Sequence, residues 1–598
     1  MPQSTAVDFL REYFMRMADI HGTGGATKET SYYSALENLL NRFGGDLKPR
    51  VICNGQLRNE GAGNPDFGLY TGSQVQGGEP RKGQIPERAV IEVKGLSEQT
   101  WQTADSAQAS KYFGRYRLVL ITNYRDFRLI GADANGKAIE LEKYTFAEDA
   151  RAFWAMTAKP SPSAHRHAIH FEEFVRRVMM TAAPLLRAED IAWFLASYAK
   201  DALATVNEKD ASNLEPLRKA LETALGIRFE GKDGIHFFKS TLIQTLFYGV
   251  FSAWAVHVKQ SKSPFDWKAA AYTLTVPMVK ALFEQIATPS KLGALGLMPV
   301  LDRTTSALNR VDKAAFFKTF DTGAAVQHFY EPFLQAFDPE LRKALGVWYT
   351  PPEIVTYMVE RVDRVLRTEL DRPDGLADKA VYILDPCCGT GTYLVAVLRR
   401  IEETIRSQGA DALLADDIRQ AAKERVFGFE LLSAPFVVAH WRVGNYLAEI
   451  GAPLDAAQGE RAAIYLTNAL TGWEPPSGPK AALPNFPEMA LERDAAEHVK
   501  LEVPILVILG NPPYNAFAGT SPAEEGDLVD AYKEGLVSKW GIKKFNRDEL
   551  YARFFRIAER RINSLGCGIV CYISNYSYVS EQSFVVMREK LLQTFDTF

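Results

Sequence analysis

The chain has 598 residues, of which 47% are hydrophobic and 24% charged, with a formal net charge of −4. This is the composition of an ordinary globular protein, and the length predicts about three or four domains. The net charge gives no overall polyanion-binding signature. The chain has only five cysteines, which argues against a disulfide framework and for a reducing cytoplasm, and none of them shows zinc-finger spacing.

A cluster of charged residues is predicted near the N-terminus. Asp66 stands at the start of a short apolar run, and residues 88–95 form an apolar strand that carries Glu92 and Lys94. Glu92 and Lys94 are two residues apart, so both project to one face of the strand. If Asp66 begins the neighbouring strand, two carboxylates and an ammonium group converge, which can bind Mg²⁺ and act on a phosphate. The alternative is a solvated strand with ordinary surface charges.

Two predicted helices supply further candidates. Residues 32–40 form an amphipathic helix that can carry a third acid, Glu37, while Gln108 and Tyr112 share one face of a later helix. In order along the chain, these residues resemble the PD-(D/E)xK nuclease fold with its Gln-x-x-x-Tyr extension, as found in restriction nucleases. The resemblance implies Mg²⁺ bound by Asp66, Glu92 and Glu37, and catalytic roles for Asp66, Glu92, Lys94, Gln108 and Tyr112.

The segment Gly131–Ala138 nearly spells a phosphate-binding P-loop. Ala138 replaces the Ser or Thr that would bind Mg²⁺, and the segment lies between two strand-like runs instead of before a helix. Asn135-Gly136 is a hairpin signal, so we predict a turn. With no other Walker-type sequence in the chain, we expect no use of ATP.

Residues from about 150 to 345 show apolar residues at helical spacing, which predicts a helical region. His165, His167 and His170 follow a Ser/Pro-rich stretch, and we interpret them as solvated linker histidines and not as a metal site. Residues 240–258 carry no charged side chain and are long enough to raise the question of a membrane helix. Polar residues within this stretch favour a buried helix, so no membrane association is expected.

A strand, a glycine-containing turn and a helix are predicted over residues 381–401. Ligands of a parallel α/β sheet bind at the carboxyl ends of its strands, where Asp385 would stand. Gly389 and Gly391 allow a ligand to approach the backbone closely. The spacing of the glycines is not Gly-x-Gly-x-x-Gly, so a dinucleotide is disfavoured. A cofactor that bears an amino acid fits better, because the N-terminus of the helix would attract its carboxylate.

The tetrapeptide Asn511-Pro512-Pro513-Tyr514 follows the apolar run 504–510. The Asn511 side-chain oxygen and the Pro512 carbonyl can each accept one hydrogen of an amino group, and the prolines hold that carbonyl rigidly. Tyr514 offers a flat face for a planar ring. Taken alone, the same four residues are more often only a stiff turn.

Residues 346–598 resemble S-adenosylmethionine-dependent adenine-N6 DNA methyltransferases through five ordered matches. Asp385–Gly391 is similar to their cofactor motif and Asn511–Tyr514 to their catalytic motif. The other three segments are Gly346–Val355, Val426–Glu430 and Ile464–Leu470, although Asn468 stands where the family often has Asp. The resemblance implies cofactor contacts by Tyr349, Thr350, Pro351, Asp385, Pro386, Cys387, Gly389, Thr390, Gly391, Glu430 and Asn468. It also implies catalysis by Asn511, Pro512, Pro513 and Tyr514 on a flipped-out base, a step that requires no metal.

Together the motifs resemble single-chain restriction–modification enzymes of type IIG or type ISP. We expect a multidomain α/β protein: a PD-(D/E)xK nuclease-like domain over 1–150, a helical connector over 151–345, and a Rossmann-like methyltransferase domain over 346–598. The methyltransferase pattern is expected to be incomplete at its C-terminal end and to lack a target recognition domain, so a separate domain or chain would select the site on double-stranded DNA.

Four alternatives stay open at this point. The nuclease-like domain can be inactive and only bind DNA, or the methyl group can go to a glutamine amide in a protein. Cytosine N4 is disfavoured as the target, because Ser more often replaces the Asn in that group of enzymes. A DNA-binding scaffold without enzymatic activity is the fourth.

Overall fold

The computed structural model describes residues 3–23, 29–55, 64–81, 84–100, 107–132, 136–181, 185, 187–209, 212–274, 276–319, 329–344, 350–409, 413–455, 458–475, 478–514, 527–542 and 549–598. The chain divides into two compact units. Unit 1 comprises Met1–Glu208, Ser263–Asp266 and Gly296–Thr319, and unit 2 comprises Lys209–Lys262, Trp267–Leu295 and Phe320–Phe598. The helices expected as a connector therefore divide between the two units.

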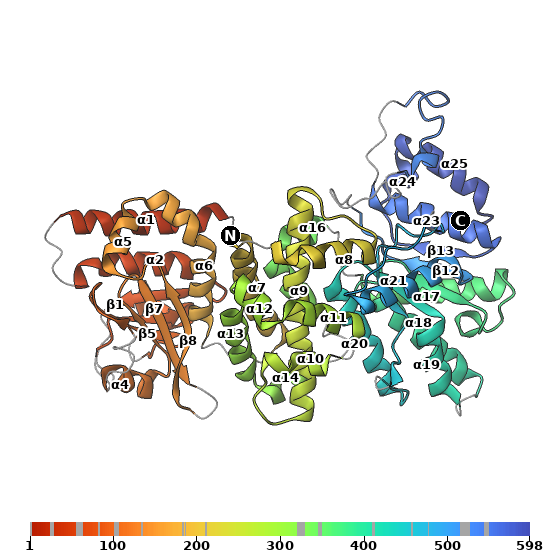
Figure 1. Ribbon diagram of the computed structural model, residues 1–598. Coiled ribbons are helices and arrows are strands. Elements are labelled where there is room, and N and C mark those ends of the chain that lie inside the picture. The colour runs from red at the N-terminus through yellow and green to blue at the C-terminus, as the bar shows by residue number, and fades with distance from the viewer. Residues whose placement is uncertain are drawn as a thin grey trace. The chain divides into compact units, whose positions relative to one another are not determined.

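Unit 1 is built on a mixed sheet of six described strands, in the order β1-β2-β5-β6-β7-β8 (Figure 1). The strands are β1 (Val51–Gly55), β2 (Phe67–Thr71), β5 (Ala89–Val93), β6 (Val119–Thr122), β7 (Asp126–Ala132) and β8 (Ala138–Thr145). Among them β5 and β6 pair in parallel and the other neighbours pair antiparallel. The predicted turn thus joins β7 to β8, with Gly136 at φ +80°, although residues 133–135 lie outside the described residues.

Every residue of the strand β5 is buried, because helices cover both faces of this sheet. Ala89, Ile91 and Val93 of β5 pack in one core with helices α1 (Gln3–Gly22), α2 (Tyr33–Gly45) and α6 (Pro160–Met180). The alternate residue Val90 packs against helix α4 (Ala107–Tyr116) in a second cluster. Glu92 lies on the same side of β5 as Val90, because strand residues alternate between faces.

The remaining described elements of unit 1 are short or lie beyond the sheet. They are η1 (Glu29–Tyr32), η2 (Gly72–Gln74), β3 (Val75–Gln76), β4 (Glu79–Pro80), α5 (Ala150–Thr157), α7 (Ala188–Glu208), α13 (Met298–Asn309) and α14 (Lys313–Thr319).

The three clustered histidines lie in α6, so the prediction of a linker there was wrong. Prolines in the first turn of a helix replace N–H groups that have no partner anyway, so the Ser/Pro-rich stretch starts a helix. His167 Nδ1 lies 2.8 Å from the Tyr144 hydroxyl, and His170 Nδ1 lies 2.5 Å from Asp201 Oδ1. Beside them the buried Arg177 donates to Glu142 and Asp201 at 3.1 Å each, which joins β8, α6 and α7.

Unit 2 begins with helices that pack together around α9 (Gly231–Gln260). The other described helices before residue 350 are α8 (Glu215–Leu225), η4 (Trp267–Ala269), α10 (Ala270–Thr273), α11 (Pro277–Ile286), α12 (Pro289–Leu295), α15 (Glu331–Phe337) and α16 (Pro339–Ala344), with η3 (Ser212–Leu214) ahead of α8. Within the described chain, α9 is the single helix long and apolar enough to cross a membrane. However, 78% of its most apolar window is buried inside the protein, in agreement with the predicted buried helix.

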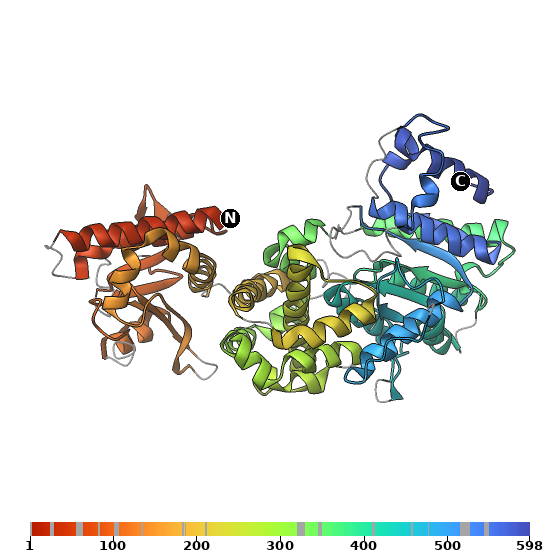
Figure 2. The same cartoon turned by 45° about the horizontal axis from the view of Figure 1, so that its top comes forward.

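The second half of unit 2 is a sheet of five described parallel strands in the order β11-β10-β9-β12-β13. The strands are β9 (Tyr382–Asp385), β10 (Val426–Glu430), β11 (Ile464–Leu466), β12 (Ile505–Gly510) and β13 (Ile569–Tyr572). Helices lie on both faces of the sheet, as Figure 2 shows: α17 (Pro352–Glu369), α18 (Thr392–Ser407), α19 (Leu414–Glu424), α20 (Ser433–Glu449), α21 (Pro487–Leu501) and α23 (Leu550–Leu565). After β13 follow α24 (Ser577–Ser580), η10 (Gln582–Phe584) and α25 (Val585–Thr594).

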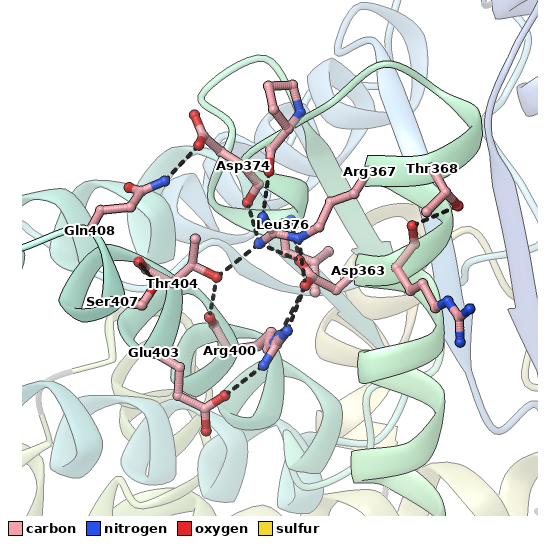
Figure 3. A network of polar contacts seen from close by, with 12 residues as sticks. Asp363, Arg367, Thr368, Asp374, Leu376, Arg400, Glu403, Thr404, Ser407 and Gln408 are labelled. Atoms are coloured by element: carbon pink, nitrogen blue, oxygen red, sulfur yellow. Dashed lines mark hydrogen bonds and ion pairs between the residues drawn. The ribbon is translucent and has the colours of Figure 1, made fainter.

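The strand order reverses between β9 and β12, so their carboxyl ends form a topological switch point, where α/β sheets bind ligands. A polar network joins helices around this sheet (Figure 3). The buried Asp363 of α17 accepts hydrogen bonds from Arg367 Nε at 3.0 Å, Arg400 Nη2 at 2.8 Å and the backbone N–H of Leu376 at 2.8 Å. These contacts join α17 to η6 (Gly375–Ala377) and α18.

Candidate functional site

Polar side chains gather where the central strands of the unit 2 sheet end. Asp385 is the last residue of β9, Glu430 is the last residue of β10, and Asn511 follows β12 directly. Gly428 pairs with Asp385, and Ile508 pairs with Leu384, so the three parallel strands end at the same edge. The predicted strand ends are therefore neighbours in the sheet.

Asp385 is buried, with 1% of its surface exposed. Its Oδ1 accepts a hydrogen bond from Cys387 N at 3.1 Å, whereas its Oδ2 has no hydrogen-bond partner among the described residues. Burial raises the pKa of this carboxyl to about 8, and the charge of Glu430 acts in the same direction. Because a buried polar atom without a partner is costly, Asp385 Oδ2 is a site for a ligand's hydrogen-bond donor.

Glu430 links the end of β10 to the turn after β9. Its Oε1 accepts hydrogen bonds from the N–H groups of Leu431 and Leu432 at 2.9 and 2.8 Å, and its Oε2 accepts one from Gly389 N at 2.9 Å. Burial raises the pKa of Glu430 to about 7, although these backbone hydrogen bonds act to lower it. Glu430 thus holds the turn in place and presents a second carboxyl at the sheet edge.

Glycines keep the space around Asp385 open. A Cβ on Gly510 would lie 2.6 Å from Asp385 Oδ1. Gly389 has a positive φ of +53°, and a Cβ there would meet nothing closer than Cys387 O at 4.0 Å. Gly391, at φ +79°, starts α18 close against Ala439. An open backbone turn beside an unpaired carboxyl oxygen fits a ligand that donates hydrogen bonds, such as the amino-acid part of S-adenosylmethionine.

The Asn511 side chain is held from both sides. Its Nδ2 donates to Thr350 Oγ1 at 3.0 Å, and its Oδ1 accepts from the Tyr514 hydroxyl at 2.9 Å. Pro512 is buried, while Asn511, Pro513 and Tyr514 are half-buried. Thr350 is 8% exposed, and Pro351 directly precedes α17. The hydrogen bond between Thr350 and Asn511 thus joins the predicted cofactor segment to the Asn511 loop. Tyr349 lies outside the described residues.

Asn468 contacts the loop that follows α8. Its backbone N–H donates to Leu225 O at 3.0 Å, and its Oδ1 accepts from Leu470 N at 2.9 Å, while its Nδ2 lies 3.5 Å from Gly226 O. The side chain therefore joins the loop after α8 to the end of β11, and its contact with a cofactor stays a prediction. Lys500, which the sequence did not single out, is also buried here and donates to Asn468 O at 2.7 Å.

The other predicted cofactor residues lie in one turn. Pro386, Cys387 and Thr390 stand between the end of β9 and the start of α18, around the two glycines.

In unit 1, Asp66 directly precedes β2, and Glu92 lies on the neighbouring strand β5. Phe67 pairs antiparallel with Ile91, which places Asp66 opposite Glu92. Asp66 Oδ2 accepts a hydrogen bond from Val93 N at 2.7 Å, and Asp66 Oδ1 accepts one from the Tyr33 hydroxyl. The Lys94 Nζ lies 2.7 Å from Glu92 Oε1. The predicted convergence of two carboxylates and one ammonium group is thus present.

Burial and pairing shift the pKa values of this cluster. Burial raises the pKa of Glu92, although the hydrogen bond from Lys94 acts to lower it. Burial alone would lower the pKa of Lys94, but the hydrogen bond and charge of Glu92 raise it. Lys94 is thereby held as a cation beside the acids.

The remaining nuclease candidates are less closely tied to this cluster. Glu37 lies on α2, and none of the described hydrogen bonds or ion pairs joins it to Asp66 or Glu92. Glu29, which the sequence did not single out, acts electrostatically on both Glu92 and Lys94.

The two candidates on α4 lie apart from these acids in the sequence. Tyr112 is buried in α4 against Val90, Val119 and Ile121, and the side chain of Gln108 lies outside the described residues. The described residues contain no group of three or more His, Cys, Asp or Glu side chains placed to hold a metal ion.

Residues 322–451 match the family model of the N-6 DNA Methylase. The chain contains an N-6 DNA methylase domain. This match includes Asp385 and Glu430, and the family implies use of S-adenosylmethionine. The open space at Gly389 and the unpaired Oδ2 of Asp385 agree with such a ligand. It ends before Asn511 and does not include residues 1–150, so the nuclease resemblance of that segment stays a prediction.

Solved structures are similar to this chain at low sequence identity. The DrdV–DNA complex, determined by cryo-electron microscopy, is 20% identical over 99% of this chain and 52% of that chain, with a TM-score of 0.49. The ATP-dependent Type ISP restriction–modification enzyme LlaBIII bound to DNA is 19% identical over 73% and 28%, with a TM-score of 0.50. A nuclease-deletion mutant of the Type ISP enzyme LlaGI with a DNA substrate mimic is 19% identical over 75% and 35%, with a TM-score of 0.49.

The chain spans about half or less of the length of these three proteins. No curated protein sequence matches it. The structure and the family match together show an α/β fold with an N-6 methylase domain.

Proposed function

We propose that unit 2 is an adenine-N6 DNA methyltransferase, which transfers a methyl group from S-adenosylmethionine to N6 of adenine in double-stranded DNA. The observation that carries this proposal is the placement of the Asn511 carboxamide. It follows β12, next to the strand β9 that ends in Asp385, and two strands of this sheet, β9 and β10, lie within the methylase match. A carboxamide acceptor next to a cofactor site is the arrangement needed to hold an amine for methylation.

The chain's own residues would position the amine and hold the cofactor. The lone pair of an aromatic amine is delocalised into its ring, so the nitrogen is a poor nucleophile. Hydrogen bonds from its two hydrogens to Asn511 Oδ1 and the Pro512 carbonyl favour a tetrahedral nitrogen with a free lone pair. Tyr514 would stack on the base after it leaves the duplex. Asp385 and Glu430 would hold S-adenosylmethionine, which supplies the methyl group when bound.

Labelled S-adenosylmethionine tests this function. We expect transfer of label to DNA by the full chain, and loss of transfer in Asn511→Ala with the protein still folded. Transfer to protein instead of DNA would favour a glutamine amide as the target. A folded protein that binds no S-adenosylmethionine in calorimetry would favour a DNA-binding scaffold.

We further propose that unit 1 is a Mg²⁺-dependent DNA endonuclease and that the two activities form a restriction–modification system. The adjacent carboxylates of Asp66 and Glu92 support this, because magnesium sites use one or two carboxylates and complete their coordination with water and substrate phosphate. Lys94 would stabilise negative charge on the phosphate.

Cleavage of unmodified DNA with Mg²⁺ is the test of the nuclease. Asp66→Ala should abolish the cutting. Equal cutting by this variant would remove the site assignment, and no cutting by the wild-type chain would favour a nuclease-like domain that only binds DNA.

The proposed organisation is a nuclease domain over 1–150, a helical connector over 151–345 and a methyltransferase domain over 346–598, in a cytoplasmic protein. Recognition of the DNA sequence is assigned to a separate domain or chain. LlaBIII is described as ATP-dependent, but this chain matches only 28% of it. The prediction that this chain uses no ATP is tested by running both reactions with and without the nucleotide.

A further inference from the structure

The carboxylate of Asp66 is held by hydrogen bonds to both of its oxygens. The backbone N–H of Val93 on β5 donates to Asp66 Oδ2 at 2.7 Å, and the Tyr33 hydroxyl on α2 donates to Asp66 Oδ1. The backbone of Asp66 is fixed as well, because its N–H donates to Ile91 O at 3.0 Å. Strand β5 and helix α2 therefore meet at one carboxylate.

The ring of Tyr33 has a defined position next to this acid. Tyr33 is the first residue of α2, and its ring centroid lies 5.0 Å from that of Phe67, with the ring planes at 56°. Phe67 directly follows Asp66 and is buried in the core of unit 1. The ring and the hydroxyl of Tyr33 thus contact two consecutive residues. Tyr33 and Asp66 are themselves half-buried, so an ion from solvent can reach the carboxylate.

The second hydrogen bond decides how the Asp66 carboxylate is oriented. The last torsion of an Asp side chain has broad energy minima, so a single hydrogen bond leaves the plane of the carboxylate free to tilt. A donor at each oxygen, one from β5 and one from α2, fixes that plane. An ionised carboxylate has about four acceptor positions, so two hydrogen bonds leave others for a metal ion.

The donors to Asp66 differ in charge from the donor to Glu92. The cationic Lys94 Nζ lies 2.7 Å from Glu92 Oε1, whereas the phenol and the amide that hold Asp66 are neutral. A neutral donor orients a carboxylate without offsetting its negative charge. Two carboxylates from adjacent strands fit Mg²⁺, a hard cation that takes oxygen ligands, and ligating carboxylates depend on further hydrogen bonds for their orientation.

We propose that Tyr33 is a positioning residue that orients Asp66 to bind a divalent cation. The inference rests on the Mg²⁺-dependent nuclease proposed for unit 1 and deepens it. Tyr33 was not among the predicted site residues, although it lies on the same helix as the predicted Glu37. Among the described hydrogen bonds, it is Tyr33 that joins α2 to Asp66.

Binding of Mn²⁺, which shares the preference of Mg²⁺ for oxygen ligands, tests the proposal without DNA cleavage. Electron paramagnetic resonance measures free Mn²⁺ while the full chain is titrated, and the binding that Asp66→Ala removes defines this site. Tyr33→Phe keeps the ring and removes only the hydroxyl. We expect the Kd for Mn²⁺ at this site to rise by about 10- to 100-fold in Tyr33→Phe.

Tyr198→Phe is the matched control in unit 1. It also removes a phenol that donates to a carboxylate, since the buried Tyr198 hydroxyl lies 2.5 Å from Glu142 Oε1. Glu142 lies on β8, three positions from β5 in the order of the sheet. The Kd for Mn²⁺ in this variant should stay within about twofold of wild type. Urea denaturation checks that both variants are folded.

The Mg²⁺ dependence of DNA cleavage gives a second measurement. In Tyr33→Phe, the Mg²⁺ concentration for half-maximal cutting should rise by about tenfold or more. The value of kcat at saturating Mg²⁺ should return to within a few-fold of wild type, because a weakened metal site is filled at high concentration. A loss of kcat that saturating Mg²⁺ does not restore would contradict the positioning role.

The possible results separate this inference from the proposed nuclease. A Kd for Mn²⁺ in Tyr33→Phe that is equal to or lower than that of wild type would overturn the inference alone, and so would an equal rise in Tyr198→Phe. A wild-type chain that binds no Mn²⁺ through Asp66 would refute the inference together with the nuclease. Binding through Asp66 that Tyr33→Phe weakens, without any cutting of DNA by the wild-type chain, would refute only the nuclease.

Discussion

Asp385 and Glu430 end neighbouring strands and are held by one turn: Asp385 accepts from Cys387 N at 3.1 Å, and Glu430 accepts from Gly389 N at 2.9 Å. Two buried carboxyls therefore share one short segment. Burial raises the pKa of Asp385 to about 8 and that of Glu430 to about 7. A fraction of both groups is thus protonated at neutral pH when no ligand is bound.

This predicts that S-adenosylmethionine binds more tightly as the pH rises from 6 to about 9. The cationic ligand favours ionised carboxyls, so below their pKa values binding must release protons, and affinity falls by up to about tenfold per pH unit for each group. Above about pH 9 the affinity should level off. Calorimetry in buffers of different ionisation enthalpy measures both affinity and proton release, and Asp385→Asn should flatten the profile. Tighter binding at low pH would contradict this account.

Gly510→Ala should weaken S-adenosylmethionine binding by at least about tenfold without unfolding the protein. The new methyl group would lie 2.6 Å from Asp385 Oδ1 and push the carboxyl away, and such overpacking costs about 1–3 kcal/mol. Gly444→Ala is the matched control, because a Cβ there meets nothing within 4 Å. An unchanged Kd in Gly510→Ala would show that the carboxyl can move without loss.

Tyr514→Phe and Tyr514→Ala separate stacking from hydrogen bonding. Phe keeps the ring and frees Asn511 Oδ1 from the hydroxyl that now occupies it, so methyl transfer should stay within a few-fold of wild type. Ala removes the ring, and loss of base stacking predicts about 10- to 100-fold lower kcat/KM. Equal loss in both variants would mean that the hydroxyl, and not the ring, is what matters.

Asp363→Ala should destabilise unit 2 by about 2–4 kcal/mol, because it leaves two half-exposed arginines and the Leu376 N–H without their acceptor. Urea denaturation measures this, and Glu403→Ala, which removes an exposed partner of Arg400, should cost about 0–1 kcal/mol. A loss no larger than that of the control would remove the structural role of the network.

Asp363 also predicts an acid limit for stability. Burial alone would raise its pKa, but the hydrogen bonds from Arg367, Leu376 and Arg400 lower it below the ordinary value of 3.8. A lowered folded-state pKa means that the stabilisation is fully present above the unfolded-state pKa and is lost as the pH falls through the folded-state value. Asp363→Asn should therefore be less sensitive to acid below about pH 4 than wild type.

The residues that the sequence predicted best are those whose position depends on local structure. Asp385 and Glu430 end apolar strands and Asn511 directly follows one, and the strands of a parallel sheet end at one edge, so the motif order already implied their proximity. Asp66 and Glu92 could be placed in the same way, as polar residues at the ends of adjacent strands.

Contacts across long stretches of sequence could not be predicted in this way. Asn511 and Thr350 are 161 residues apart, and no local pattern states that they share a hydrogen bond. Likewise the contact of Asn468 with Leu225 depends on how the helices before residue 350 pack against the sheet. His167 and His170 were misassigned because their partners, Tyr144 and Asp201, lie on other elements.

The central claim is that Asn511 presents an acceptor to the N6 amine of adenine. The most direct measurement is mass spectrometry of the nucleosides released from DNA after incubation with S-adenosylmethionine and the full chain, or Asn511→Ala. The account predicts N6-methyldeoxyadenosine with the wild-type chain and none with the variant. N4-methyldeoxycytidine as the product, or N6-methyldeoxyadenosine at equal levels with Asn511→Ala, would contradict it.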